Sequence, residues 1–313
     1  MFIDFGAILI ALVLLIWSAD QLVRYSSSLA QHLGITPFLI GIIVIGFGTS
    51  APELFVSALA SVQGKGNLAI GNALGSNITN IGLVLGCATL ISVLTLTQRM
   101  IRVDLTTIFA TSIIALLLIL DATLSRVDGA ILMILMVVFL VWSARSNKAD
   151  PLEELDEFDH TISKAKAGLW TVVSLIILIG SSKLLVTGAV NIAAALGVSE
   201  LIIGLTIVAI GTSLPELAAS IAALRQKEGS MVIGNIIGSN TFNTLGVLGL
   251  TGLIRTTQVE PSVMHRDFPV LFIIMTLLLI FVLPKQQLQR WQGGVLLLSY
   301  FAYLGYLISQ ALA

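Results

Sequence analysis

Long apolar runs alternate with short polar connections along the whole chain. A helix needs about 20 apolar residues to cross a bilayer. Ten runs approach or exceed this length, and we expect membrane helices at residues 3–25, 37–60, 68–94, 104–121, 127–144, 168–190, 199–224, 230–254, 267–283 and 291–311. A polar stretch, residues 145–167, separates them into two groups of five. The pattern predicts an all-α integral membrane protein with ten transmembrane helices.

The composition agrees with a lipid environment. The chain has 313 residues, of which 57% are hydrophobic and 11% are charged, and its mean hydropathy is +1.02. An average soluble domain carries roughly 25% charged residues, so this chain lacks the polar surface that water requires. The net charge of −1 gives no basic field for nucleic acid. We therefore expect the lipid bilayer as a partner and no nucleic acid.

The basic residues are distributed unevenly between the two sides of the predicted spans. Eleven of the sixteen Lys and Arg residues, among them Arg99 and Arg102, fall on one side, and five, among them Lys65 and Arg255, fall on the other. Cytoplasmic loops carry the excess of basic residues. We expect a multi-pass protein of the plasma membrane (a bacterial inner membrane or archaeal cell membrane), with both termini outside.

An internal repeat relates the two halves. Residues 48–54 (Gly-Thr-Ser-Ala-Pro-Glu-Leu) match residues 211–217 (Gly-Thr-Ser-Leu-Pro-Glu-Leu) at an offset of 163. Residues 71–77 match residues 234–240 at the same offset. Five spans per repeat is an odd number, so the second repeat should cross the membrane upside down. We expect a first five-helix repeat at 1–144, an acidic cytoplasmic loop at 145–167 and a second, inverted repeat at 168–313.

Two acidic residues, Glu53 and Glu216, occupy equivalent places inside apolar spans. A charged side chain at the bilayer centre costs at least about 2.5 kcal/mol, so such residues usually serve function. We expect the other acids to lie at span ends or in loops. Thr49 and Ser50 precede Glu53 by four and three residues, and these spacings place all three side chains on one helix face. Pro52 cannot donate a backbone hydrogen bond, which leaves a carbonyl free nearby.

A polar stripe on the following span adds further oxygen atoms. Asn72, Ser76 and Asn80 recur every four residues, and the equivalent positions are Asn235, Ser239 and Asn243. The set contains carboxylates, hydroxyls, amides and carbonyls without His or Cys, which favours a hard cation. Ca²⁺ takes six to eight oxygens in flexible geometry. Two carboxylates balance one Ca²⁺ or two Na⁺, and an empty, doubly negative site should cross the membrane poorly. Competition for one site therefore predicts antiport.

These motifs resemble the two alpha repeats of the cation/Ca²⁺ exchanger superfamily, here at residues 48–86 and 211–249, and most resemble those of prokaryotic Na⁺/Ca²⁺ exchangers. Proton-coupled members usually carry Gly-Asn-Ala/Thr-x-Glu where this chain has Gly-Thr-Ser-x-Pro-Glu. The resemblance implies that Glu53 and Glu216 are the central Ca²⁺ ligands. It implies further oxygens for Ca²⁺ or Na⁺ from Thr49, Ser50, Thr212, Ser213, Ser76, Ser239, Asn80 and Asn243, and from the backbone carbonyls of Gly46 and Ala209.

One departure from the family bears on the transported ions. Potassium-dependent relatives carry Asp at the position of Asn243, so K⁺ co-transport is not expected here. Three functions remain open: Na⁺/Ca²⁺ antiport, antiport of Ca²⁺ or another divalent cation against H⁺, and passive cation conduction. We expect no enzymatic activity, no cofactor, no nucleotide and no obligatory protein partner.

Overall fold

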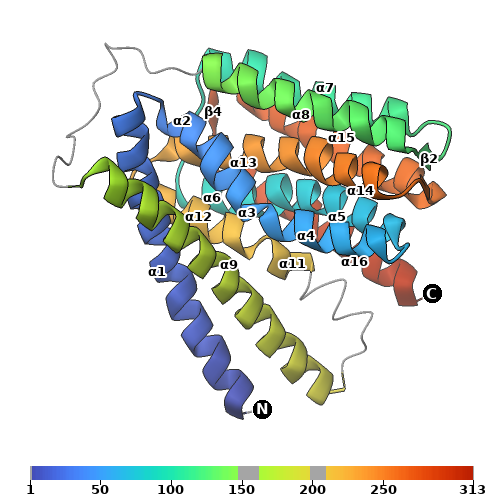
Figure 1. The fold of residues 1–313 in the computed structure, drawn as a ribbon, viewed down its shortest axis with the longest axis horizontal. Helices are drawn as coiled ribbons and strands as arrows, with labels where there is room; N and C mark the ends of the chain where they lie inside the picture. The colour runs from blue at the N-terminus through green and yellow to red at the C-terminus, as the bar shows by residue number, and fades with distance from the viewer. Residues whose placement is uncertain (1, 147–161, 198–208, 313) are drawn as a thin grey trace.

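The computed structural model describes residues 2–146, 162–197 and 209–312, and within these ranges the chain is almost wholly helical (Figure 1). Labels with η mark π-helical segments. The helices of the first half are α1 (Phe2–Leu33), α2 (Pro37–Ile40), η1 (Gly41–Gly46), α3 (Phe47–Thr49), α4 (Ala51–Val62), α5 (Gly66–Thr79), η2 (Asn80–Leu85), α6 (Gly86–Ile91), η3 (Met100–Leu105), α7 (Thr106–Leu118) and α8 (Arg126–Ser146). Those of the second half are α9 (Lys164–Ala195), α11 (Ala209–Thr212), α12 (Leu214–Arg225), α13 (Gly229–Thr241), η5 (Phe242–Val247), α14 (Leu248–Ile254), η6 (Val263–Asp267), α15 (Phe268–Val282) and α16 (Arg290–Leu312).

Seven continuous helices in the described ranges are long and apolar enough to cross a membrane, and the bent pair 37–49 and 51–62 makes an eighth. The predicted span 230–254 coincides with the continuous run α13–η5–α14, residues 229–254. The predicted span 199–224 begins among residues 198–208, outside the described part of the chain. Most of the predicted acidic loop also lies outside it. The structure is thus an all-helical membrane protein, while the count of ten spans stays a prediction.

Helices α1 and α9 are longer than predicted and lie side by side. Each has 32 residues, which at 1.5 Å per residue is about 48 Å, well beyond the hydrocarbon thickness of about 30 Å. Both run obliquely to the rest of the bundle and project from it (Figure 1). Tyr25, at the predicted end of the first span, stacks on Trp170 of α9 at a ring-centroid distance of 5.6 Å. Lys183 lies within α9 and is exposed.

The irregularities of the backbone repeat along the chain. Ser50 separates α3 from α4, and Ser213 separates α11 from α12. The π-helical segments η3 and η6 begin at residues 100 and 263, again 163 apart. In the last helix of each half the offset becomes 164, as Gly129 and Gly293 illustrate by packing against Gly249 and Gly86. The two halves therefore share local structure as well as sequence motifs.

Two short antiparallel ribbons connect the halves. Strand β1 (Leu94–Thr95) pairs with β4 (Gln287–Leu288), and β2 (Thr123–Leu124) pairs with β3 (Thr257–Gln258). Each ribbon takes one strand from each half. Strands β4 and β2 lie at opposite ends of the bundle (Figure 1). A ribbon therefore joins the two halves at each end of the bundle.

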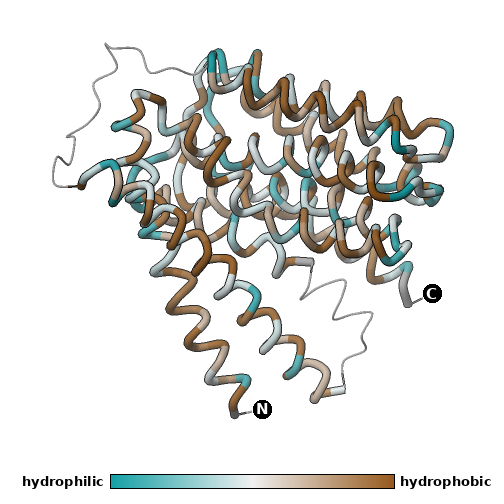
Figure 2. The backbone as a smooth tube through the Cα atoms, in the orientation of Figure 1, coloured by the Kyte–Doolittle hydropathy of each residue, from teal (hydrophilic) through white to brown (hydrophobic). Residues whose placement is uncertain are grey.

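Close glycine packing brings α13 against η1. A Cβ atom on Gly41 would lie 2.5 Å from the carbonyl oxygen of Met231, and one on Gly238 would lie 2.4 Å from that of Ile42. Real side chains do not tolerate such distances, so glycine is required for this approach. It places the Asn235–Ser239 turn of α13 against the segment that leads to Ser50. Figure 2 shows hydrophobic residues along α1, α7 and α8 and hydrophilic residues at the ends of the bundle, as expected for helices in lipid.

Candidate cation site

Glu53 and Glu216 each lie in the first turn of a helix that follows a break. Glu53 follows the interruption at Ser50, and Glu216 follows the interruption at Ser213. Pro52 stands beside the first break, where its missing N–H group removes a helical hydrogen bond, and the helix axis bends there by 40°. The exposed fractions of Glu53 and Glu216 are 0% and 1%. Both carboxylates are therefore held in the protein interior beside equivalent helix breaks.

Residues of both repeats surround the carboxylates. Glu216 lies beside the hydroxyls of Thr49 and Ser50, and within electrostatic range of Glu53. Glu53 lies beside Ser76. The four carboxylate oxygens have no hydrogen-bond partner among the described residues. The neighbouring hydroxyls are therefore close to the carboxylates but not in hydrogen-bond geometry with them. Oxygens from the two repeats therefore face one another in a single site without satisfying one another.

Buried oxygens without a hydrogen-bond partner recur at the same positions in both repeats. Within the part of the chain that the structure describes, they include side-chain oxygens of Ser50, Glu53, Asn80, Ser213, Glu216 and Asn243. Leaving such a group unsatisfied costs about 1–3 kcal/mol, and more for a charge. Ca²⁺ and Na⁺ bind oxygen atoms of this kind. The donor set thus fits a hard cation as cargo.

The balance of charge in the site rests on the two glutamates. The described ranges contain no group of three or more His, Cys, Asp or Glu side chains that could hold a metal ion. A cation at Glu53 and Glu216 would therefore complete its shell with neutral hydroxyl, amide and carbonyl oxygens. Two negative charges match one divalent or two monovalent cations.

The other predicted ligands are placed around this core. Thr49 donates its hydroxyl to the carbonyl of Ile45 at 2.9 Å, so its oxygen lone pairs remain available to accept. Ser239 donates to the carbonyl of Gly46 at 3.2 Å, and that carbonyl also accepts the N–H of Ser50 at 3.2 Å. The Gly46 carbonyl is therefore already occupied, and a cation there would displace the Ser239 hydroxyl. Ala209 and Thr212 begin and end helix α11.

Two asparagines fasten the glutamate-bearing helices to their neighbours. Asn72 donates its amide to the Ser57 hydroxyl at 3.0 Å and to the Glu53 carbonyl at 3.4 Å. Asn235 makes the equivalent bonds, at 3.1 Å to Ser220 and 3.3 Å to Glu216. The sequence placed Asn72 and Asn235 on the polar stripe but gave no role to the two serines. The structure identifies both pairs as positioning groups for the carboxylates.

Asn77 and Asn240 are additional polar residues that the sequence interpretation did not select. Both are fully buried, and the side-chain carbonyl oxygen of each has no hydrogen-bond partner among the described residues. Asn77 donates to Thr244 of the other repeat at 2.9 Å. Asn240 donates instead to the backbone carbonyl of Ile236 at 2.9 Å. Their recurrence in the duplicated Gly-Ser-Asn motif was the signal that could have identified them.

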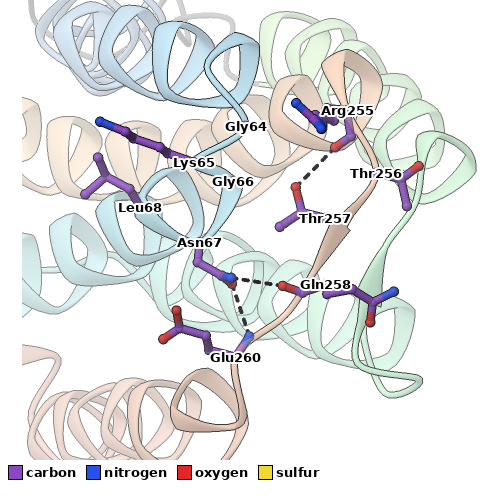
Figure 3. Close-up of a pocket in the computed structure, with 10 residues that line it drawn as sticks. All are labelled: Gly64, Lys65, Gly66, Asn67, Leu68, Arg255, Thr256, Thr257, Gln258 and Glu260. Atoms are coloured by element: carbon purple, nitrogen blue, oxygen red, sulfur yellow. Dashed lines mark hydrogen bonds between the residues drawn. The ribbon is translucent and has the colours of Figure 1, made fainter.

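A separate polar cavity of about 540 Å³ lies where the α4–α5 turn meets the segment containing β3 (Figure 3). Asn67 joins its walls by donating to the Gln258 carbonyl at 3.0 Å and accepting the Glu260 N–H at 3.1 Å. The predicted ligands do not line this cavity. Its walls carry Lys65 and Arg255, which are unsuited to holding a metal ion. The paired glutamates, and not this cavity, therefore define the candidate site.

A helical membrane protein with two buried carboxylates between broken helices belongs to the class of ion transporters. The sodium/calcium exchanger protein family matches residues 3–145 and 166–309 of this chain. The chain belongs to that family. It is a membrane protein of a transporter family, not of an enzyme family.

Relatives and solved structures agree over nearly the full length. A protein of Alkalimonas amylolytica with the name "Putative antiporter CaxA" is 40% identical over 305 residues, which cover 95% of this chain and 96% of the relative. The sodium/calcium exchanger MaX1 of Methanosarcina acetivorans is 29% identical, with coverages of 96% and 97%. A structure of the sodium-calcium exchanger NCX_Mj, soaked with zero Na⁺ and Ca²⁺, superposes with a TM-score of 0.87 at 35% identity, covering 97% of this chain and 99% of the other.

Proposed function

We propose that this protein is a secondary antiporter that exchanges Na⁺ for Ca²⁺ at the Glu53–Glu216 site. The observation that carries the proposal is the repeated set of buried, unsatisfied oxygens around these two residues. Because Ca²⁺ and Na⁺ would bind the same unsatisfied oxygens, the site should hold either Ca²⁺ or its full set of Na⁺ ions, and not both together. Family membership and the similarity to NCX_Mj support the same pair of ions.

The proposed ligands have different roles in binding the cations. Glu53 and Glu216 neutralise the cargo, while Ser50, Ser213, Asn80 and Asn243 replace its water. Thr49, Thr212, Ser76 and Ser239, with the carbonyls of Gly46 and Ala209, would complete the flanking Na⁺ sites. Because the Ser239 hydroxyl already occupies the Gly46 carbonyl, ion binding there would change a contact between the repeats. Such a contact offers a route from ion occupancy to a change of conformation.

Alternating access would follow from the repeat architecture. We infer ten spans arranged as two inverted five-helix repeats, 1–144 and 168–313, joined by the acidic loop 145–167. The ribbon pairing supports this arrangement, because exchanging the two halves converts the β1–β4 pair into the β3–β2 pair at the opposite end. Two equivalent conformations, each open to one side, are what such symmetry provides.

The proposed location is the plasma membrane, with both termini outside and the central loop in the cytoplasm. Arg99 precedes η3 at the β1–β4 end of the bundle, and Arg255 precedes β3 at the other end. The excess of basic residues over the whole sequence assigns the β1–β4 end to the cytoplasm.

Exchange of Ca²⁺ against H⁺ is a second candidate. The four unsatisfied carboxylate oxygens can bind protons as well as metal ions, and the name of the CaxA relative specifies an antiporter without specifying its ions. The duplicated Gly-Thr-Ser-x-Pro-Glu motif favours Na⁺ over H⁺ as the coupling ion.

Proteoliposomes would separate the two functions. Vesicles loaded with Na⁺ and diluted into Na⁺-free buffer should take up ⁴⁵Ca²⁺, whereas choline-loaded vesicles should not. Dissipating the Na⁺ gradient with an ionophore should abolish uptake. Uptake that depends on an imposed pH gradient and is independent of Na⁺ would identify H⁺, and not Na⁺, as the coupling ion. Equal uptake without any counter-ion gradient would contradict antiport.

A further inference from the structure

Two other acidic residues lie at the ends of predicted spans, as expected, and are buried there at equivalent positions of the two repeats. Asp104 is in η3 and Asp267 is in η6, 163 residues apart, each near the beginning of a predicted span. Their exposed fractions are 0% and 4%. A buried carboxylate requires compensation by a cation or by hydrogen-bond donors. The two repeats meet this requirement differently.

Asp267 is compensated by side chains of its own repeat. Arg266 donates through Nε to one carboxylate oxygen at 2.7 Å and through Nη2 to the other at 3.2 Å. The Tyr303 hydroxyl adds a third bond at 2.9 Å. This carboxylate therefore has a positive partner and three donated hydrogen bonds.

Asp104 has no such partners. Val103 stands at the position equivalent to Arg266, and Phe139, which is equivalent to Tyr303 at the offset of 164, lacks the hydroxyl. Both carboxylate oxygens of Asp104 are without a hydrogen-bond partner among the described residues. Arg99 lies within electrostatic range, but it is exposed and its guanidinium donates to the Ser146 carbonyl.

In the part of the chain that the structure describes, the helices next to Asp104 carry no further charged residue. Helix α7 continues from η3, and α15 of the other repeat packs against it. Neither helix contains an Asp, Glu, Lys, Arg or His residue. On η3 itself the other charged residue is Arg102, which is exposed. A charged Asp104 therefore lacks the compensation that Arg266 and Tyr303 give to Asp267.

We propose that Asp104 is a second cation site, separate from the paired glutamates, which takes one small monovalent cation, H⁺ or Na⁺, in the role that Arg266 has in the other repeat. The bound cation neutralises the carboxylate at a contact between the repeats. A proton satisfies the carboxylate without further ligands, whereas Na⁺ would bring water or nearby carbonyls with it. The site lies toward the β1–β4 end of the bundle, because η3 follows β1.

The test is the thermal stability of the full-length protein in detergent. Glu53→Gln/Glu216→Gln serves as the parent, so that the central site contributes no carboxylate. Its Tm is measured while pH is raised in Na⁺-free choline buffer, and separately while Na⁺ is added at fixed pH. Asp104→Asn and Val103→Arg/Phe139→Tyr are each added to this parent. The second variant rebuilds the Asp267 arrangement around Asp104 and keeps the carboxylate.

Loss of the cation from Asp104 leaves an uncompensated buried charge, so the parent Tm should fall as pH rises or increase as Na⁺ is added. Both added variants should remove that dependence. Removal of the pH dependence identifies H⁺, and removal of the Na⁺ dependence identifies Na⁺. A parent and an Asp104→Asn variant with the same dependence would overturn the proposal. If Asp104→Asn does not fold, unchanged dependence in Val103→Arg/Phe139→Tyr would overturn it instead.

Discussion

The hydroxyl of Ser239 donates a hydrogen bond to the backbone carbonyl of Gly46, 3.2 Å away, and thereby joins the second repeat to the first beside the paired glutamates. The same hydroxyl lies 3.3 Å from the Asn235 side-chain oxygen. Ser239 thus connects an expected ligand, the Gly46 carbonyl, to the asparagine that positions Glu216.

Replacing Ser239 with alanine should weaken ion binding without unfolding the protein. The change removes one oxygen ligand and one hydrogen bond worth about 0.5–1.5 kcal/mol, so the Na⁺ concentration for half-maximal exchange should rise by roughly two- to tenfold. Ser299→Ala is the control, because the hydrogen bond of the Ser299 side chain among the described residues stays within its own helix, to the Val295 carbonyl. Equal ion dependence in the two variants would exclude Ser239 from the site.

Asn72→Ala and Asn235→Ala should each lower both stability and exchange. Either change leaves a buried serine hydroxyl and a glutamate carbonyl without their donor, at a cost of about 1–3 kcal/mol. The melting temperature in detergent and the rate of ⁴⁵Ca²⁺ uptake measure the two effects. Asn67→Ala, which removes an amide of the same kind at a half-buried position in the separate cavity, is the matched control for exchange. Uptake at the wild-type rate in both asparagine variants would show that the carboxylates need no such support.

Gly238→Ala should destabilise the contact between α13 and η1. The new Cβ would lie 2.4 Å from the Ile42 carbonyl oxygen, and overpacking of this kind costs about 1–3 kcal/mol. Gly305→Ala is the control, because a Cβ atom added at Gly305 would meet no other atom within 4 Å and alanine favours a helix over glycine. The expected result is a lower Tm for Gly238→Ala and an equal or higher Tm for Gly305→Ala.

Exchange by the wild-type protein should not depend on K⁺. Asn243 is buried and its side-chain oxygen lacks a hydrogen-bond partner among the described residues, but it brings no negative charge. Asn243→Asp adds a third carboxylate, which should attract an additional monovalent cation and make uptake sensitive to K⁺. Replacing K⁺ with choline in the assay buffers checks both statements. Wild-type uptake that stops without K⁺ would contradict the first.

The sequence predicted those features that depend on local pattern and on the repeat. The Pro-Glu motif indicated a free backbone carbonyl beside Pro52, and the structure interrupts the helices next to both copies of the motif, at Ser50 and Ser213. The all-helical membrane fold and the exchanger family were predicted correctly. These predictions succeeded because proline, buried carboxylates and apolar runs each constrain structure over a few residues.

The features that were missed depend on contacts between distant segments. Asp104 and Asp267 lie near the ends of apolar runs, where an acid usually reaches the interface, but packing between the repeats buries both. Ser57 and Ser220 looked like ordinary small residues until the asparagine amides were placed against them. The strands β1 to β4 have two residues each, and each pairs with the other half of the chain. No local pattern encodes such contacts.

The most direct test of the central claim is Na⁺-driven ⁴⁵Ca²⁺ uptake by Glu53→Gln and by Glu216→Gln in proteoliposomes, with direct ⁴⁵Ca²⁺ binding to the purified variants. Glu260→Gln, which changes an exposed acid in the separate cavity, is the control. Each central substitution removes a charged ligand worth about 1.5–3 kcal/mol, so Ca²⁺ binding should weaken by roughly 10- to 100-fold, uptake should be lost, and Glu260→Gln should behave as wild type. Wild-type binding and uptake in either central variant would show that the ion site lies elsewhere.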